Sequence, residues 1–322
     1  MLFKLFEKKR QFTLKSSGLS MFPILYDSDL VYYQKIKFSQ IKINDLILIR
    51  KNKIFLTHRT IYKNNIYLIT KGDNNPESDG KIYSRDILGK ACQVKRSGKV
   101  VNPENIYLMQ STLYLQEIIE IKKAFNQAEL DYLFLKGLPL HLFYEKTHPR
   151  RIYLDCDVLI DKNQLKTAIQ ILKRQGFKKI EKPLSQIQQK LKNKEVEFAY
   201  TKIINNFPVT FDLHLEPVFL MTELGELNEL YPQKLLDQLT QELLNTKREI
   251  KINNNQFLIL NSKFLILYLA LHFFHHNYSG AFRLDFIDKV IRKSKLSKKQ
   301  WGQLAMKIHE YHLQNYIYAS FI

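Results

Sequence analysis

Apolar residues in the first third of the chain occur in short runs that turn residues separate. The runs are rich in β-branched and aromatic residues, which favour strands, and the clearest are DLVYYQKI, DLILIRKN, IFLTHRTIYK and NIYLITKGD. Gly, Pro and Asn in SGKVVNPEN, which begins at residue 97, mark the end of this pattern. We therefore predict a small, mostly β domain over residues 1–105.

From residue 106 the apolar spacing alternates between helical and strand-like segments. STLYLQEIIEIKKAFNQAEL and KNQLKTAIQILKRQG have helical spacing, and Gly176 ends the second. PLHLFYE is expected to be a short helix, and the chain from about residue 222 is expected to be helical. The strand candidates are DYLFLKG, RIYLDCDVLI, VEFAYTKI and PVTFDLHL, of which the last two are expected to form a hairpin.

These patterns predict an α+β fold class. The small β domain precedes a second domain over residues 106–322, which combines a mixed sheet with helices and a helical C-terminal region. The longest apolar run, residues 264–274, is too short to span a bilayer, so we expect a buried helix and no membrane span.

Composition and charge narrow the class of protein further. The chain has 322 residues, of which 45% are hydrophobic, and this is enough for a substantial core. The net charge of +19 comes from basic residues that are scattered along the chain rather than clustered, so nucleic acid is disfavoured as a partner. MLFKLFEKKRQF reaches clustered charges before an apolar segment accumulates, and Cys92 and Cys156 match no disulfide or metal spacing. We therefore expect a cytoplasmic protein.

Three motifs in the first domain contain the components of a hydrolytic triad. GLSMFP places Ser20 in a loop that a glycine begins and a proline ends, and LTHRTI places His58 in a strand-like segment. TKGDNNPESD adds Asp73 and Asp79 in a loop rich in Gly, Asn and Pro. A serine needs a base to remove its proton, and an imidazole needs a carboxylate to orient it. The expected set is Ser20, His58 and either Asp73 or Asp79.

Together with the DSDLV and NDLILI strands, these motifs resemble the signal peptidase I family over about the first 95 residues. Because His58 stands where the usual bacterial enzyme has Lys, the resemblance is to the archaeal and endoplasmic-reticulum type. It implies Ser20 as nucleophile, His58 as general base, and Asp73 and Asp79 as supporting acids. The membrane enzymes carry an anchor beside the serine, whereas about 19 mixed residues precede Ser20 here. We therefore expect a cytosolic substrate.

Carboxylates with the spacing of a metal site occur in the second domain. Asp155 and Asp157 in LDCDV are two residues apart, so on a strand their side chains project to the same face. Like charges side by side are unfavourable unless a cation joins them, and Mg²⁺ prefers such oxygen ligands. Asp212 in TFDLHL can add a third ligand and act as general base in metal-dependent nucleotidyl transfer. The alternative is a solvated strand edge or turn pair that holds no metal.

The segments LKGLPLHLFYEKTHPRRIYLDCDVLI and FDLHLEP resemble the DNA polymerase β-type nucleotidyltransferase superfamily, most closely its uncharacterised bacterial branch with an LKG motif. The resemblance covers about residues 110–290 and implies a nucleoside triphosphate substrate, with ATP expected. It implies that Asp155 and Asp157 bind Mg²⁺ and that Asp212 completes the triad. The residues implied to contact the nucleotide are Lys136, Gly137, Arg150 and Arg151. Leu138 follows Gly137 where the wider superfamily has serine, so a serine contact to phosphate is absent.

A histidine-rich segment near residue 275 is a weaker candidate for a metal site. His272 and His276 are four residues apart on a predicted helix, but no glutamate of an HExxH motif accompanies them. We expect polar contacts or a pocket wall from His272, His275 and His276. Charged residues just beyond them are expected to form helix caps or salt bridges, and these are Arg283, Asp285 and Asp288.

The hypothesis that follows is a bifunctional protein. It combines a serine endopeptidase with a Mg²⁺-dependent nucleotidyltransferase, and it tailors a ribosomally made peptide or another small acceptor. Two alternatives remain open. One is a nucleotidyltransferase whose inactive peptidase-like domain only binds a peptide. The other is a self-cleaving regulator that binds nucleic acid, against which the lack of a recognisable helix-turn-helix before the peptidase-like part counts.

Overall fold

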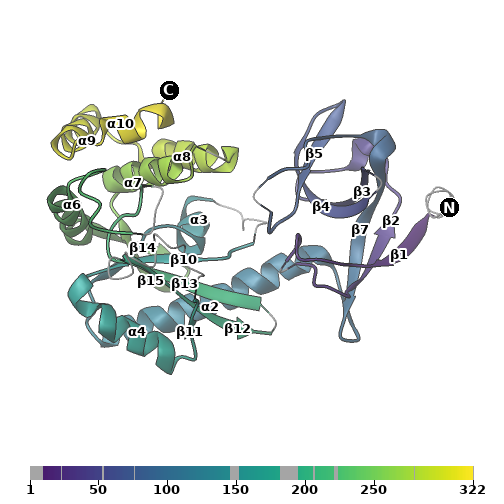
Figure 1. Ribbon diagram of the computed structural model, residues 1–322, viewed down its shortest axis with the longest axis horizontal. Helices are drawn as coiled ribbons and strands as arrows, with labels where there is room; N and C mark the ends of the chain where they lie inside the picture. Colours follow the sequence, from purple (N-terminus) through teal and green to yellow (C-terminus); the bar gives the residue numbers. More distant parts are fainter. Residues whose placement is uncertain are drawn as a thin grey trace. The chain divides into compact units, whose positions relative to one another are not determined.

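The computed structural model describes residues 10–321 apart from residues 23, 53, 76, 146–151, 182–194, 206, 221–223 and 279. The chain divides into an N-terminal unit, which comprises Met1–Thr112 and the short segment Arg150–Ile152, and a C-terminal unit, which comprises Leu113–Pro149 and Tyr153–Ile322 (Figure 1). Each unit contains its own sheet, and helices are concentrated in the second. The predicted α+β class is confirmed.

The N-terminal unit is built on one curled antiparallel sheet (Figure 1). Its strands are β1 (Gln11–Lys15), β2 (Leu30–Gln34), β3 (Leu46–Lys51), β4 (Ile54–Lys63), β5 (Tyr67–Lys71), β6 (Lys81–Tyr83), β7 (Ile87–Arg96) and β8 (Lys99–Val101). They lie in the order β1-β2-β7-β3-β4-β5-β6, and β8 pairs with β7. The short 3-10 helices Phe38–Gln40 and Ser84–Asp86 precede β3 and β7. Ile47, Ile49, Leu68 and Ile82 pack with Ile41 in a buried cluster.

Four of these strands, β2 to β5, correspond to the segments that the apolar runs predict. The sequence pattern did not identify β7, although it is one of the two longest strands of the sheet. Gly89 within β7 weakens the strand signal, since glycine has a low preference for strands. The structure explains why glycine is needed there: an added Cβ would lie 3.0 Å from the carbonyl oxygen of Gln34 on β2. The glycine allows the two backbones to approach closely.

Helix α2 (Pro103–Gln127) begins in the N-terminal unit and continues into the C-terminal unit. The boundary expected between residues 105 and 106 therefore falls within a helix, seven residues before the division between the compact units. Ile118, Ile121 and Phe125 of α2 are fully buried in the core of the C-terminal unit.

The described residues of the C-terminal unit form a seven-stranded mixed sheet. Its strands are β9 (Tyr132–Phe134), β10 (Cys156–Ile160), β11 (Lys178–Lys179), β12 (Glu197–Ile204), β13 (Phe207–His214), β14 (Lys247–Ile252) and β15 (Asn255–Leu260). They lie in the order β11-β12-β13-β10-β9-β15-β14. The pairs β10–β13 and β9–β15 are parallel, and the other neighbours are antiparallel. The expected hairpin of β12 and β13 is present.

Helices cover both sides of this sheet. In the described part of the chain they are α2, together with α3 (Leu138–Tyr144), α4 (Leu165–Arg174), α6 (Gln233–Asn245), α7 (Ser262–His275), α8 (Ala281–Ser294), α9 (Lys298–Glu310) and α10 (Gln314–Ile317), with 3-10 turns at Lys162–Gln164 and Tyr318–Ser320. Figure 1 shows α7, α8 and α9 on one side of the sheet and α4 on the other. The predicted buried helix over residues 264–274 is confirmed as α7. Across the described residues, no helix combines the length and apolar character needed to cross a membrane.

The expectation of a wholly helical chain beyond residue 222 is wrong. Residues 247–260 instead form the antiparallel hairpin of β14 and β15. Asn253 in the turn has a φ of 52°, a left-handed conformation that asparagine tolerates and that tight hairpin turns require. Buried Phe257 and Ile259 project from β15 into the core, so tertiary packing favours a strand here.

Candidate functional sites

The loop that carries Ser20 is held by local and distant backbone contacts. Gly18 begins it with a φ of 86°, a conformation that glycine adopts without strain. The amide of Asn74 donates to the carbonyl oxygen of Ser20 at 2.9 Å. Gly72 lies so near that an added Cβ would be 2.6 Å from that same oxygen. The Gly-Asp-Asn loop therefore fixes the backbone of the serine.

The side chains of Ser20, His58 and Asp79 form a continuous hydrogen-bonded chain. His58 Nε2 lies 3.0 Å from Ser20 Oγ, and His58 Nδ1 lies 2.7 Å from Asp79 Oδ2. With Nδ1 donating to the carboxylate, Nε2 can accept the hydroxyl proton of Ser20. His58 is buried at 2% exposure on β4, whereas Ser20 is half-buried. This geometry can activate a serine for nucleophilic attack.

The two candidate aspartates have different partners. Asp79 also accepts a hydrogen bond from Thr70 Oγ1 at 2.7 Å. Burial alone would raise the pKa of Asp79, but the hydrogen bonds from His58 and Thr70 lower the pKa below its ordinary value, so the carboxylate is ionised at neutral pH. Asp73 is instead bound by Arg59, whose Nε and Nη2 lie 2.6 and 2.5 Å from its two carboxylate oxygens. Asp73 thus anchors the Gly-Asp-Asn loop, while Asp79 orients the imidazole.

In the C-terminal unit, Asp155, Asp157 and Asp212 come together at the centre of the sheet. Asp157 of β10 and Asp212 of β13 are direct partners in the parallel register, and Asp155 immediately precedes β10. One carboxylate oxygen from each lies within 4.8 Å of the other two. Sequence spacing predicts the pairing of the first two, and the parallel strand pair brings in the third.

Lys136 is the main basic side chain at this cluster. Its Nζ lies 2.9 Å from Asp157 Oδ2 and 3.4 Å from Asp155 Oδ2. Burial by itself would lower the pKa of Lys136, but the charges of Asp157 and Asp155 raise the pKa above its ordinary value, so the ammonium stays charged. Gly137 follows it with a φ of 95° and precedes α3.

The electrostatics of the three carboxylates differ. Burial alone would raise the pKa of Asp157, but Lys136 and His214 lower the pKa to about 2. Burial and the negative charges of Asp157 and Asp155 raise the pKa of Asp212 to about 7. Asp212 Oδ1 is also buried without a hydrogen-bond partner among the described residues. A buried, unpaired oxygen beside two further carboxylates fits a divalent cation, which would supply the missing positive charge.

Two acidic or basic residues at this cluster were not identified from the sequence. His214 Nε2 lies 3.0 Å from Asp157 Oδ1, and His214 Nδ1 lies 3.8 Å from Glu197 Oε2. His214 is two residues after Asp212 on β13, so the alternation of the strand would have placed both on one face. Glu197 belongs to a different strand, and no local sequence signal connects it to the site.

The remaining candidates lie elsewhere or outside the described residues. Arg150 and Arg151 lie outside the described residues. His272 Nε2 and His276 Nε2 lie 3.1 Å apart in a hydrogen bond, which agrees with the expected polar contact. Asp288 forms an exposed pair with Arg292 one helical turn away.

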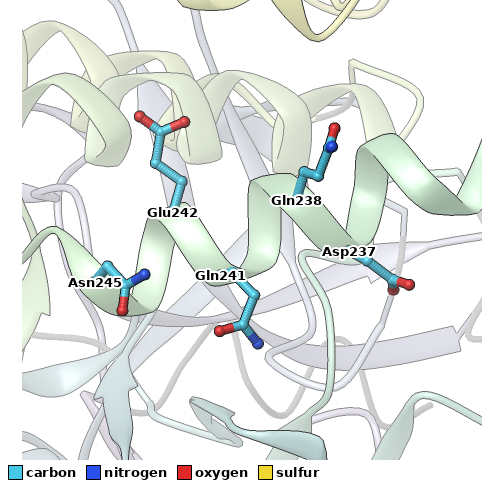
Figure 2. Close-up of a pocket in the computed structure, with 5 residues that line it drawn as sticks. All are labelled: Asp237, Gln238, Gln241, Glu242 and Asn245. Atoms are coloured by element: carbon cyan, nitrogen blue, oxygen red, sulfur yellow. The ribbon is translucent and has the colours of Figure 1, made fainter.

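A surface hollow lies along α6 and is lined by Asp237, Gln238, Gln241, Glu242 and Asn245 (Figure 2). All five side chains come from this one helix, and none belongs to the aspartate cluster. Glu242 accepts hydrogen bonds from Lys307 and from the Tyr311 hydroxyl, so it joins α6 to the C-terminal helices. The hollow contains no arrangement of catalytic side chains.

Solved structures similar to the chain include two nucleotidyltransferase-related proteins. The antibiotic-resistance factor ANT(2'')-Ia is 13% identical, and the match covers 65% of this chain and 97% of that one with a TM-score of 0.39. An antigenic nucleotidyltransferase-like protein from Paracoccidioides brasiliensis is 15% identical, with 65% and 90% covered and a TM-score of 0.34. No curated protein matches the chain.

A family model gives the clearest relationship. The model, described as uncharacterised nucleotidyltransferase, matches residues 104–322. The likeness of the first 95 or so residues to signal peptidase I lies outside this match and stays a prediction. Because the match covers more than half of the chain, the chain belongs to this family of uncharacterised nucleotidyltransferases.

Proposed function

We propose that the C-terminal unit transfers a nucleotidyl group from a nucleoside triphosphate to a hydroxyl group of a peptide or small-molecule acceptor. The observation that carries this proposal is the cluster of Asp155, Asp157 and Asp212, with carboxylate oxygens within 4.8 Å of one another. Membership of the nucleotidyltransferase family supports the same class of reaction. We expect ATP as the nucleotide and the cytoplasm as the location.

Each residue of the cluster has a role in this proposal. Asp155, Asp157 and Asp212 hold the metal, and bound Mg²⁺ supplies charge neutralisation at the phosphates. The acceptor oxygen forms a bond to the α-phosphorus, the bond to the β-phosphate oxygen breaks, and pyrophosphate leaves. Asp212 accepts the hydroxyl proton. Lys136 and Gly137 would contact the phosphates, and Arg150 and Arg151, which lie outside the described residues, are expected to join them.

Nucleotide binding tests this proposal without knowledge of the acceptor. The full chain is titrated calorimetrically with a non-hydrolysable ATP analogue in the presence of Mg²⁺, and labelled ATP is then offered with candidate peptides and metabolites. Asp157→Asn should weaken metal-dependent binding or transfer by about 100-fold or more, because a metal ligand is worth several kcal/mol. Asp237→Asn changes an exposed carboxylate of the same unit and serves as the control. Equal activity of the two variants would contradict the assignment.

The hydrogen-bonded chain of Ser20, His58 and Asp79 favours a second candidate function, a serine endopeptidase in the N-terminal unit. Ser20 Oγ would attack a peptide carbonyl carbon while His58 takes its proton and returns it to the leaving amine. Water then releases the acyl group from Ser20. Asp79 holds the imidazole and stabilises its charged form.

A fluorophosphonate probe tests the second candidate directly, because it reacts with activated serines. The probe should label the native chain at Ser20, and Ser20→Ala or His58→Ala should abolish labelling. Ser39→Ala removes an exposed serine of the same unit and should have no effect. Failure to label the native chain would favour the alternative in which this unit only binds a peptide.

Both sites in one chain suggest successive modification of one precursor peptide, by cleavage and by nucleotidyl transfer. Under this hypothesis the two activities are chemically independent. Ser20→Ala should therefore keep nucleotide transfer, and Asp157→Asn should keep probe labelling. Loss of both activities in either single variant would contradict two separate centres.

A further inference from the structure

His214 is a buried histidine that the proposed reaction scheme does not yet use. It is the last residue of β13 and only 4% exposed. An apolar side chain would fill such a position without any polar group to satisfy, and burial of a polar ring is unfavourable unless it is hydrogen-bonded. The contacts of the ring therefore indicate why a histidine is present.

The sheet register places His214 on the same face as the carboxylates. Asp157 and Asp212 are partners across β10 and β13, and His214 follows Asp212 by two residues. Glu197 of β12 is the direct partner of His214 in the antiparallel pair. Three neighbouring strands thus present Asp157, Asp212, His214 and Glu197 together.

The two ring nitrogens of His214 have different surroundings: Nε2 forms a hydrogen bond with Asp157, whereas Nδ1 has no hydrogen-bond partner among the described residues and faces Glu197. Nε2 lies 3.0 Å from Asp157 Oδ1, and Nδ1 lies 3.8 Å from Glu197 Oε2. The other oxygen of Asp157, Oδ2, lies 2.9 Å from Lys136 Nζ. The imidazole therefore forms a hydrogen bond with Oδ1 of Asp157, while Oδ2 faces Lys136 and the other carboxylates.

We propose that His214 is a positioning residue that orients Asp157 for metal binding, with the negative charge of Glu197 on the far side of the ring. This inference rests on the proposed metal-dependent function of the C-terminal unit. A carboxylate that binds a metal through one oxygen needs its rotation fixed, and a hydrogen bond to the other oxygen fixes it. Loss of such supporting contacts weakens metal affinity by about 10- to 100-fold in other sites.

Two amide variants separate this role from simple packing. In His214→Gln the amide nitrogen reaches approximately the position of Nε2, so the hydrogen bond to Asp157 can form. In His214→Asn the shorter side chain reaches the position of Nδ1 and cannot contact Asp157. Both variants are polar and no larger than histidine. His141→Gln is the matched control, because His141 is a buried histidine of the same unit with a hydrogen bond to the Tyr153 hydroxyl.

The probe is Mn²⁺ alone, whose binding to the full chain is followed by electron paramagnetic resonance. We expect His214→Asn to raise the dissociation constant about 10- to 100-fold. His214→Gln should stay within about fivefold of the native value, since its amide replaces the same hydrogen bond. His141→Gln should match the native protein, and thermal melting followed through Trp301 shows that each variant is folded.

The outcomes separate this inference from the proposed function. Absence of Mn²⁺ binding by the native chain would refute the metal-dependent function and this inference with it. Native binding with an unchanged His214→Asn variant would overturn the positioning role alone. Equal weakening by the Asn and Gln variants would also overturn it, because the effect would then not depend on the contact to Asp157.

Discussion

Replacement of Asp212 by asparagine should stabilise the metal-free C-terminal unit while it removes metal binding. Asp212 is half-buried beside two other carboxylates, and its Oδ1 has no hydrogen-bond partner among the described residues. Burial and the charges of Asp157 and Asp155 raise the pKa of Asp212 to about 7. An asparagine at this position carries no charge, so neither the burial of a charged group nor its repulsion by Asp157 and Asp155 destabilises the fold.

The size and pH dependence of the effect follow from the raised pKa. An unfolded chain ionises Asp212 near the ordinary value of 3.8, whereas the folded protein retains the proton up to about pH 7. The stabilisation from this proton is therefore complete below about pH 4 and is lost as the pH rises through 7. The difference between the two pKa values corresponds to about 4 kcal/mol. The free energy of unfolding of the Asp212→Asn variant should therefore exceed that of the native protein by up to this amount at pH 8, and the two should be equal at pH 4.

The only tryptophan of the chain, Trp301, makes the measurement specific to the C-terminal unit. It lies on α9 and packs against the core of this unit, so its fluorescence follows unfolding there. Urea unfolding of the native and Asp212→Asn proteins is compared from pH 4 to pH 8 in the presence of a chelator, which keeps both proteins free of metal. The same series with Mg²⁺ should stabilise the native protein and leave the variant unchanged.

A control variant and two outcomes test the raised pKa of Asp212 and its role as a metal ligand. Asp237→Asn removes an exposed carboxylate of α6 and should not change the pH dependence of stability (Figure 2). If Asp212→Asn shows the same decline in stability between pH 4 and pH 8 as the native protein, the raised pKa is refuted. If Mg²⁺ stabilises the variant as much as the native protein, Asp212 is not a metal ligand.

Two further predictions concern the N-terminal unit. Gly72→Ala should reduce probe labelling of Ser20 by about 10-fold or more and destabilise this unit by about 1–3 kcal/mol, because the new Cβ would lie 2.6 Å from the Ser20 carbonyl oxygen; native labelling of the variant would contradict this steric argument. Hydrogen bonds from His58 and Thr70 lower the pKa of Asp79 despite its burial, so its stabilising contribution is present above about pH 4 and lost at lower pH. Hydrogen exchange of β4 should show a steeper loss of protection on acidification in the native protein than in Asp79→Asn, and parallel losses would count against the lowered pKa.

Local patterns predict the elements whose burial follows from their own residues. The strands β2 to β5 and the apolar helix α7 are examples, because β-branched runs and continuous apolar stretches leave few other solutions. The hairpin of β14 and β15 was missed, since its strand character depends on the packing of Phe257 and Ile259 against residues distant in the chain.

The candidate sites divide in the same way. The spacing of Asp155 and Asp157 predicts a shared face from the alternation of a strand, which is a local property. The inclusion of Asp212 depends on parallel pairing with a strand more than 50 residues later, and that of Glu197 on the next pairing in the sheet.

Motif residues identify Ser20 and His58, but the sequence leaves Asp73 and Asp79 equivalent as partners of the imidazole. The folded loop distinguishes the two aspartates, because Arg59 binds Asp73 while His58 and Thr70 contact Asp79. Residue types and short-range spacing therefore specify which chemistry is available. Strand register and loop packing decide which groups meet, because contacts between distant segments form only when the whole sheet closes around its core.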